Sequence, residues 1–410
     1  MGINLCRCGL LSGLLPKPGE SIMSAQTDEL FPDQSAPADA PERRYNTGIL
    51  PSQEIHALID SGALRADPPV LPEQVQPASL DLRLGPVAYR VRASFLPGKN
   101  HTVQSKVADL GTHEIDLTKD AVLERGGVYI VPLLESVKLR KGLSGVANPK
   151  SSTGRLDIFT RLITDYATEF DRIPEGYTGP LYVEVSPSTF SIKVRQGSRL
   201  VQARLRRGTP SPSAAATQRL HDRVGLLSAP DGEEIPADAI DRDVPVSVDL
   251  RGRDGDGLVG YKARAHTDLI DVDRVGGYPV AEFWEPVYAP KGALILDPNA
   301  FYILVSREEV RVPPDHAAEM LPFNPLKGEF RVHYAGFFDP GFGYSEDDSA
   351  GSRAVLEVRS FEVPFLLEHG QTVAQLVYEP LTQVPDRVYG QGIGSNYQRQ
   401  GLKLSKHFYD

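Results

Sequence analysis

Cysteine is nearly absent from this chain of 410 residues. The two cysteines, Cys6 and Cys8, both lie among the first ten residues. The body of the protein therefore has neither a disulfide framework nor a set of cysteine ligands for a metal ion. We expect a protein of a reducing compartment, the cytoplasm.

Long apolar runs and an excess of basic residues are also missing. No stretch approaches the roughly 20 consecutive apolar residues that span a bilayer, and the formal net charge is −10. That charge argues against nucleic acid or an anionic membrane surface as the main partner, but it leaves room for a local basic pocket that binds a small anion. Residues 23–44 are rich in serine, proline, alanine and acids. Such a composition buries too little apolar area to offset ordering, so we expect residues 1–44 to be a disordered tail.

One short basic cluster stands out from this acidic background. The stretch NPKSSTGRLDIF places Lys150, Ser151, Ser152 and Arg155 directly before an apolar, strand-like segment. Positive charge, small hydroxyls and backbone N–H groups suit an anionic oxygen, and phosphate is the obvious candidate. Taken alone, these residues favour a simpler interpretation, a serine-capped helical turn followed by a solvated surface arginine.

The sequence contains an internal repeat. VYIVPLLESV (128–137) aligns with FYILVSREEV (301–310), LYVEV aligns with VLEV, and GSRLVQ aligns with GQTVAQ. Five matched pairs lie 173 residues apart, among them Glu184 with Glu357. Self-similarity at one spacing indicates a duplicated structural unit and sets the domain count at two.

Each copy consists of short β-branched segments broken by Gly, Pro and Asp, which is typical of an all-β barrel or sandwich. We expect a first barrel over residues 45–207, a linker over 208–240 and a second barrel over 241–410. A helix is expected at PSQEIHALIDSGAL (51–64), with Ser52 as its cap and Ile55, Leu58 and Ile59 on one face.

In this order the segments resemble the dCTP deaminase and dUTPase family, specifically its long, duplicated type of 2'-deoxycytidine 5'-triphosphate deaminase. The resemblance extends over roughly residues 46–408. It rests on ILPSQEIHALIDSGAL with VQPASLDLRLG, LLESVKL with NPKSSTGR, FFDPGFG with AVLEV, GQTVAQLVYEPL, and the terminal YGQGIGSNYQRQGLKLSK. It implies two tandem dUTPase-like distorted β-barrels, assembly about a threefold axis into a homo-oligomer, and nucleotide pockets between neighbouring barrels.

The resemblance also implies site residues. Glu357 would be the catalytic carboxylate, and Asp339 would belong to the FFDPGFG hairpin beneath the base. The remaining residues would bind the phosphates or close over them: Lys150, Ser151, Ser152, Arg155, Tyr389, Tyr397 and Gln400. Considered alone, Glu357 favours a simpler interpretation, a solvated outward carboxylate of an alternating strand. Asp339 is a turn residue before proline and glycine, which is compatible with a role in the site.

Neither repeat carries the full set of these residues. The second repeat has NPLKGEFR in place of NPKSSTGR, so it keeps Lys327 and Arg331 but lacks the serine pair. The first repeat has IPEGYTG in place of DPGFG and no Tyr/Gln segment, and Asn396 stands where the family has a lysine. We therefore hypothesise a composite pocket, with phosphate donors from the first repeat and Asp339, Glu357 and the terminal segment from the second.

The implied reaction is hydrolytic deamination at C4 of cytosine, in which Glu357 takes a proton from water. The H-x-E and P-C-x-x-C signature of zinc deaminases is missing, so we expect metal-independent conversion of dCTP to dUTP and ammonia, without zinc. Mg²⁺ is expected only through the triphosphate, and dTTP is a candidate inhibitor. Residues 397–410 are expected to lie outside the packed barrel and to become ordered over bound nucleotide.

Two other function classes stay open. One is a dUTPase-like pyrophosphatase, alone or combined with deamination, in which a carboxylate activates water against the α-phosphate. The other is a protein that binds deoxynucleotides without turning them over.

Overall fold

The computed structural model describes residues 46–210, 212–229, 235–252, 257–321, 336–345, 351–360, 362–390 and 401–409, and the backbone of 330–332. The predicted tail, residues 1–44, lies outside the described residues. Within the described part, no helix is long and apolar enough to cross a bilayer.

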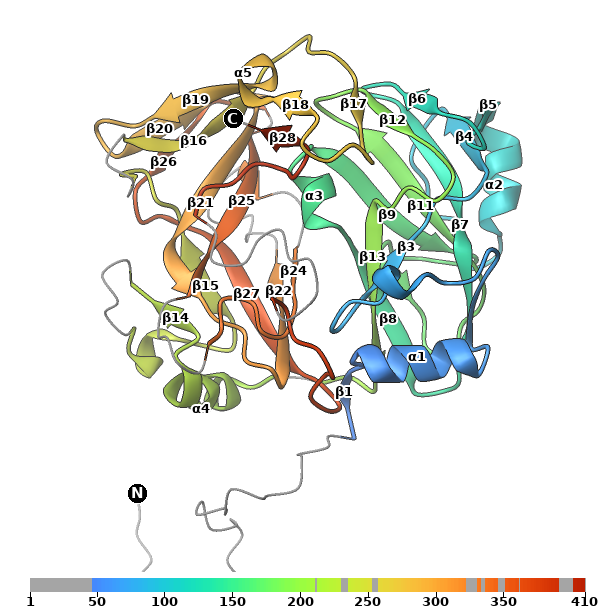
Figure 1. Ribbon diagram of the computed structural model, residues 1–410, viewed down its shortest axis with the longest axis horizontal. Coiled ribbons are helices and arrows are strands. Elements are labelled where there is room, and N and C mark those ends of the chain that lie inside the picture. Colours follow the sequence, from blue (N-terminus) through green and yellow to red (C-terminus); the bar gives the residue numbers. More distant parts are fainter. Residues whose placement is uncertain are drawn as a thin grey trace, which may run out of the picture. The chain divides into compact units, whose positions relative to one another are not determined.

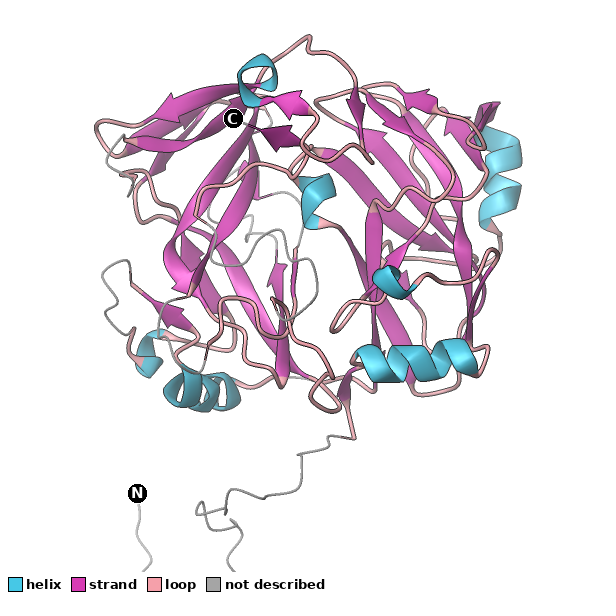
Figure 2. Ribbon diagram, viewed as in Figure 1, coloured by secondary structure: helices cyan, strands magenta, loops and turns pink. Residues whose placement is uncertain are grey.

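Strands dominate the described residues and helices are few and short, which confirms the all-β prediction (Figure 2). The α-helices and 3₁₀-helices are α1 (Ser52–Asp60), η1 (Pro72–Gln74), α2 (Val103–Leu110), α3 (Ser151–Gly154), α4 (Ala214–Val224), η2 (Ala237–Ala239) and α5 (Val280–Phe283).

Helix α1 is the helix predicted from the sequence. Ile55 is buried on its inner face, and Leu58 and Ile59 pack against the same core. Ser52 does not cap the helix, because the N-cap is Pro51 and the Ser52 hydroxyl instead donates to the side chain of Gln53. Pro51 is extended, and Ser52 is the first helical residue.

The first repeat contributes strands to three sheets, one of which includes β17 of the second repeat. Their orders are β1-β13-β8-β10 with β3 beside β13, β5-β4-β7-β11-β9 with β2 beside β7, and β6-β12-β17. The strands of residues 46–210 are β1 (Gly48–Ile49), β2 (Leu64–Ala66), β3 (Leu80–Leu82), β4 (Val87–Val91), β5 (Gly111–Asp116), β6 (Ala121–Leu123), β7 (Val128–Lys138), β8 (Leu143–Pro149), β9 (Ile158–Thr164), β10 (Arg172–Ile173), β11 (Thr178–Pro187), β12 (Ile192–Val194) and β13 (Val201–Arg207).

The second repeat has the main sheets β19-β16-β21-β25-β23, with β14 beside β21, and β15-β27-β22-β24, and the pairs β18-β28 and β20-β26. Its strands are β14 (Leu227–Ser228), β15 (Val244–Ser247), β16 (Leu258–Ala263), β17 (Ile270–Asp271), β18 (Tyr278–Pro279), β19 (Trp284–Tyr288), β20 (Ala293–Leu296), β21 (Phe301–Val310), β22 (His316–Leu321), β23 (Phe330–Val332), β24 (Phe337–Phe338), β25 (Ser352–Ser360), β26 (Phe365–Glu368), β27 (Thr372–Pro380) and β28 (Phe408–Tyr409).

The two repeats share strand pairing as well as sequence. Antiparallel β7 and β11 in the first correspond to β21 and β25 in the second, and the pair β8 and β13 corresponds to β22 and β27. The register agrees at the residue level, since Glu184 lies opposite Ile130 and Glu357 lies opposite Ile303. Both pairs keep the 173-residue spacing read from the sequence.

The range predicted as a linker, 208–240, contains regular structure. Helix α4 begins after Ser213, whose hydroxyl accepts a hydrogen bond from the Ala216 N–H, and it ends at Gly225 in the left-handed conformation. Strand β14 then pairs with β21 of the second repeat. The exact boundaries of the two repeats remain predictions.

The two repeats pack directly against each other. Strand β17, from the second half of the chain, pairs in parallel with β12 of the first repeat. The core of the first repeat continues across this junction into Trp284, whose ring lies 5.6 Å from Phe190 and 5.7 Å from Phe408. Burial of such aromatic rings contributes several kcal/mol, so the junction is part of the folded core. Figure 1 shows α3 at this junction, between β9 of the first repeat and β25 of the second.

Candidate functional site

The basic cluster forms a single helical turn at the junction between the repeats. Strand β8 ends at Pro149, Lys150 stays extended, and α3 follows with Ser151 as its first residue. Because the first N–H groups of a helix have no partner within it, the start of α3 presents backbone donors beside the Ser151 and Lys150 side chains. Arg155 ends the turn and is only 3% exposed. The surface-arginine interpretation is therefore wrong.

Arg155 connects α3 to the end of the chain. Its guanidinium donates to the backbone oxygen of Lys403 at 3.0 Å, and the Ser405 hydroxyl donates to the backbone oxygen of Ser152 at 2.9 Å. Leu404 and His407 are buried here. The expectation that residues 397–410 lie outside the packed barrel is thus wrong for 401–409, because these residues satisfy backbone groups of α3 and add apolar surface to the core.

Glu357 faces α3 from the second repeat. It lies in β25 between β21 and β23, and it is 8% exposed. The interpretation as a solvated outward carboxylate is therefore wrong. A Cβ atom at Gly154 would come within 2.9 Å of its Oε2 and 3.0 Å of its Oε1, so the close approach depends on a residue without a side chain. The carboxyl of the second repeat and the turn of the first are in contact within one chain.

The surroundings of Glu357 favour a bound proton. Burial raises its pKa to about 8, the positive charge of Arg155 acts against this rise, and the negative charge of Asp157 adds to it. A carboxyl that titrates near neutral pH can both accept a proton from water and return it, which is what a general acid–base catalyst requires.

Beside Lys150 lie two further cations, Arg199 and Lys406, that the sequence analysis did not single out. Lys150 forms an ion pair with Asp81, and the Arg199 guanidinium lies 4.0 Å from the same carboxylate. Burial lowers the pKa of Lys406, and the charges of Lys150 and Arg199 lower it further. The carboxylates of Asp81 and Asp273 oppose this shift. Three cations near two acids leave a net positive charge that suits a polyanion such as a triphosphate.

Asp339 lies at the same junction and is held by the first repeat. Arg204, 1% exposed, donates to Asp339 Oδ1 at 3.1 Å and to the Phe338 backbone oxygen at 2.9 Å. Burial raises the pKa of Asp339, the Arg204 charge lowers it, and the Asp81 charge raises it. Asp339 also starts a turn, because its backbone oxygen accepts the Phe342 N–H at 3.0 Å. It is therefore both a turn residue and a member of the junction.

Tyr389 packs on this turn. Its N–H donates to the backbone oxygen of Pro340 at 2.7 Å, and its ring lies 5.8 Å from that of Phe342. Tyr397 and Gln400 lie outside the described residues. The structure thus gathers Lys150, Ser151, Ser152, Arg155, Asp339 and Glu357 at one junction, while the roles of these residues in binding and catalysis remain predictions.

The sequence did contain a signal for two of the missed cations and acids. Asp81 belongs to VQPASLDLRLG, on which the family resemblance rests, and Arg199 to GSRLVQ, which the repeat comparison matched. The sequence does not show that the two residues are neighbours, because β3 pairs with β13, which begins two residues after Arg199, only in the folded sheet.

Glu184, the counterpart of Glu357, has different surroundings. Burial raises its pKa, while a hydrogen bond to Ser94 and the charge of Arg161 lower it. All three residues belong to the first repeat, and Tyr182, two residues before Glu184 on β11, lies in one apolar cluster with Val103 and Val107 of α2. The first repeat therefore covers its own carboxyl, whereas Glu357 meets the turn of the other repeat.

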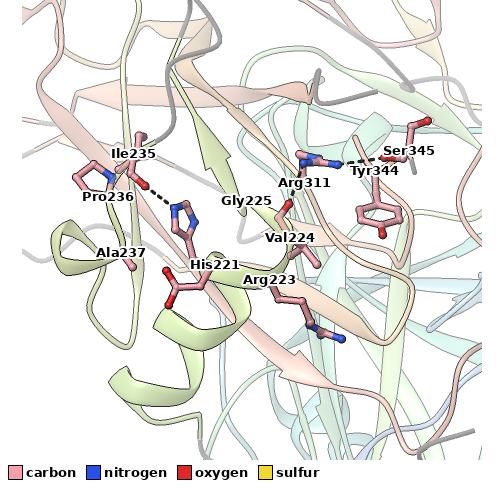
Figure 3. A pocket seen from close by; sticks show the side chains of 11 residues that line it. His221, Arg223, Val224, Gly225, Ile235, Pro236, Ala237, Arg311, Tyr344 and Ser345 are labelled. Atoms are coloured by element: carbon pink, nitrogen blue, oxygen red, sulfur yellow. Dashed lines mark hydrogen bonds between the residues drawn. The ribbon is translucent and has the colours of Figure 1, made fainter. Parts of the chain in front are cut away.

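A separate cavity of about 560 Å³ lies in the second repeat at the end of α4 (Figure 3). Arg311 crosses it, donating to the backbone oxygens of Val224 and Ser345. The nearby strand β14 pairs with Val310, seven residues along β21 from Ile303, the partner of Glu357. At about 3.3 Å per residue, Val310 and Ile303 are roughly 23 Å apart along the strand. The residues that line this cavity include none of those at the junction.

Comparison with known proteins identifies both halves of the chain. Residues 46–209 match the 2'-deoxycytidine 5'-triphosphate deaminase (DCD) N-terminal domain, and residues 213–408 match the DCD C-terminal domain. A Halobacterium salinarum protein named dCTP deaminase, dUMP-forming, is 34% identical over 188 residues, which cover 44% of this chain and 90% of that protein. A dCTP deaminase of Halorubrum lacusprofundi is 32% identical over 173 residues, which cover 40% of this chain and 77% of that protein.

A solved structure agrees with these matches. The crystal structure of 2'-deoxycytidine 5'-triphosphate deaminase from Agrobacterium tumefaciens has a TM-score of 0.77 and 55% sequence identity to this chain. The match covers 82% of this chain and all of that one.

Proposed function

Because the chain belongs to the dCTP deaminase family, we propose that it hydrolyses the amino group from C4 of dCTP and releases ammonia. The contact between Glu357 and Gly154 supports this proposal best. It places a carboxyl that titrates near neutral pH directly beside a turn whose N–H groups, hydroxyls and cations suit phosphate oxygens. A reaction on the base of a nucleoside triphosphate requires both groups in one pocket.

In this mechanism Glu357 acts first as a base and then as an acid. The ionised carboxylate takes a proton from water and passes it to ring N3 while the hydroxide attacks C4 of cytosine. Glu357 then takes the proton of the new C4 hydroxyl and gives it to the amino group, which leaves as ammonia as the carbonyl forms at C4. Water and dCTP are thereby converted into dUTP and ammonia, and the enzyme is regenerated.

The phosphates are assigned to the first repeat and to the chain end. Lys150, Ser151, Ser152 and Arg155 would bind them from α3, and Tyr389, Tyr397 and Gln400 from the terminal segment. Asp339, fixed by Arg204, would lie near the base. In this proposal Mg²⁺ arrives with the triphosphate, because the side chains beside α3 are mainly cationic and suit phosphate oxygens better than a metal ion. The reaction proceeds without zinc.

A second candidate is a bifunctional enzyme that continues from dUTP to dUMP. The name of the Halobacterium salinarum relative, dUMP-forming, favours it. Hydrolysis at the α-phosphate would need a second activated water near the triphosphate. Asp81, paired with Lys150 beside α3, is the carboxylate we propose for that role.

One incubation separates these outcomes. Purified protein is mixed with dCTP and Mg²⁺, and ammonia, dUTP, dUMP and pyrophosphate are measured. Ammonia with equal dUTP supports deamination alone, and ammonia with dUMP and pyrophosphate supports the bifunctional enzyme. Binding of dCTP without ammonia refutes deamination. Full activity after treatment with a zinc chelator checks the metal-independent chemistry, and added dTTP and sizing by light scattering check the proposed inhibition and homo-oligomer.

A further inference from the structure

A buried ion pair joins the two repeats beside Glu357. Asp157 follows α3 and is 1% exposed, and its carboxylate accepts from the guanidinium of Arg359, two residues beyond Glu357 on β25. The Thr189 hydroxyl donates to the same carboxylate at 2.5 Å, and Arg359 donates to the Asn299 backbone oxygen, also at 2.5 Å. The pair therefore ties the turn after α3 to the strand that carries Glu357.

We propose that Asp157 and Arg359 are positioning residues, an inference that rests on the proposed function. They hold β25 against α3, so that the Glu357 carboxyl meets Gly154 in a fixed orientation. Residues two apart on a strand point to the same face, so Arg359 and Glu357 both face the first repeat. A buried pair of this kind is specific in geometry, because an unpaired charge at either position would be strongly unfavourable.

The sequence of the other repeat shows that this pair serves only the Glu357 side. At the 173-residue spacing the counterpart of Arg359 is Ser186. When NPKSSTGR is aligned with NPLKGEFR, the counterpart of Asp157 is His333. Because the carboxylate and the guanidinium are both missing at these positions, Ser186 and His333 cannot form the same ion pair. The ion pair therefore occurs only where α3 of the first repeat meets β25 of the second, which is also where the proposed catalytic carboxyl lies.

The Asp157 member of the pair also acts on the charge state of Glu357. The charged groups that face its carboxyl are Arg155 and Asp157 from the first repeat, and Arg359 lies on its own strand. The Asp157 charge raises the pKa of Glu357 and the Arg155 charge lowers it. Neutralising Asp157 should therefore lower this pKa, and removing the Arg359 charge that compensates Asp157 should raise it.

Four variants test the positioning role: Asp157→Asn, Arg359→Gln, Arg359→Lys and the control Asp249→Asn. The control breaks another buried ion pair, between Asp249 and Arg353. Arg353 also lies on β25, and its Nη2 is 2.5 Å from Asp249 Oδ2. The kcat/KM for dCTP is measured from pH 5 to 10, together with the urea midpoint of each variant.

We expect the pKa of the kcat/KM profile to fall by about one pH unit in Asp157→Asn and to rise by a similar amount in Arg359→Gln. The maximal kcat should fall about tenfold or more in both, because a small misplacement of a catalytic group is costly. Arg359→Lys keeps the charge and should stay close to the wild-type pKa. Asp249→Asn should lower the urea midpoint and leave the profile pKa in place.

The inference would be overturned if the pKa of the kcat/KM profile stays unchanged in both Asp157→Asn and Arg359→Gln, or if it shifts equally in the control Asp249→Asn. The ion pair would then have a purely structural role. A carbon-13 titration of the Glu357 carboxyl, assigned with Glu357→Gln, measures the same shifts without turnover. If wild-type protein releases no ammonia but the carboxyl pKa still moves in opposite directions in Asp157→Asn and Arg359→Gln, only the proposed function is refuted. Protein that releases ammonia without such shifts would refute the positioning role alone. Where a variant fails to fold, the remaining charge-removing variant decides by the direction of its shift.

Discussion

The carboxyl of Glu357 lies so close to Gly154 that a Cβ atom there would come within 2.9 Å of Oε2. One residue belongs to the second repeat and the other to the first, and this contact joins the proposed catalytic group to the proposed phosphate turn. We expect Gly154→Ala to fold, because alanine favours helical backbone, but to displace the carboxyl. The kcat for ammonia release should fall about tenfold with little change in KM.

Gly336→Ala is the matched control for this change. A Cβ atom added at Gly336 would lie 3.8 Å from the nearest atom, a ring carbon of Phe338, which is an ordinary contact distance. Wild-type kcat in Gly154→Ala would show that the carboxyl has room to move and that its position is not critical.

Glu357→Gln should lose ammonia release on the order of 100-fold or more while it still binds dCTP, because the amide has nearly the same shape but cannot accept a proton from water. Turnover is measured by ammonia release and binding by calorimetry. Glu184→Gln, the corresponding change in the first repeat, should stay active, since that carboxyl interacts with Ser94 and Arg161 of its own repeat. Loss of activity in Glu184→Gln with an active Glu357→Gln would move the catalytic carboxyl to the first repeat.

The pH dependence of activity follows from the pKa of Glu357, which burial raises to about 8. The general base must be ionised, so kcat/KM should rise about tenfold per pH unit below pH 8 and level off above it. A profile that is flat from pH 6 to 9 in wild-type protein would contradict Glu357 as the base.

The same pKa predicts how folding stability depends on pH. The value rises from 4.5 in the unfolded chain to about 8 in the folded protein. The folded state therefore keeps a proton that the unfolded state loses, and stability falls as pH rises from about 4.5 through 8. Glu357→Gln removes this loss of stability. The difference in melting temperature between the variant and wild type should therefore be more positive at pH 9 than at pH 5, which corresponds to a few kcal/mol in the free energy of unfolding. An equal difference at both pH values would be inconsistent with a protonated Glu357.

The composite pocket predicts unequal effects of two matched arginines. Arg155→Ala should lower kcat/KM for dCTP by about 10- to 150-fold, because a charge-assisted contact contributes roughly 1.5–3 kcal/mol. Arg331→Ala, the corresponding change in the second repeat, should cost much less. Because Arg155 and Glu357 adjoin within one chain, mixing Arg155→Ala with Glu357→Gln chains should restore no activity. Recovered activity would place the two motifs in a pocket between chains.

The end of the chain should be required for stability. Phe408→Ala removes a ring that lies 5.7 Å from Trp284 and 5.5 Å from Phe283, and loss of a packed phenylalanine costs about 3 kcal/mol. The fluorescence of Trp284, the only tryptophan in the sequence, reports the transition. Tyr409→Ala, at a position 51% exposed, is the control and should melt like wild type. A wild-type melting temperature in Phe408→Ala would return the segment to the mobile role expected from the sequence.

The sequence by itself determined the duplication, the all-β class and the match between Glu184 and Glu357. These features depend on local chemistry, because a strand repeats every two residues and a duplicated unit keeps that register wherever it lies. The cluster Lys150 to Arg155 was recognisable for the same reason, since charge, hydroxyls and a helical turn lie within six neighbouring residues.

The sequence led to the hypothesis that the first repeat supplies the basic turn and the second supplies Glu357, but only the tertiary structure decided which groups surround each of them. Glu184 and Glu357 look alike in sequence, but one is covered by its own repeat and the other meets α3. Asp157 and Arg359 are 202 residues apart in the chain, so nothing in either local sequence announces their ion pair. The end of the chain reads as polar and basic, yet Ser405 and Phe408 are held by groups that become neighbours only when the repeats pack. Burial, long-range ion pairs and pKa shifts arise from packing between distant segments, and no local pattern contains them.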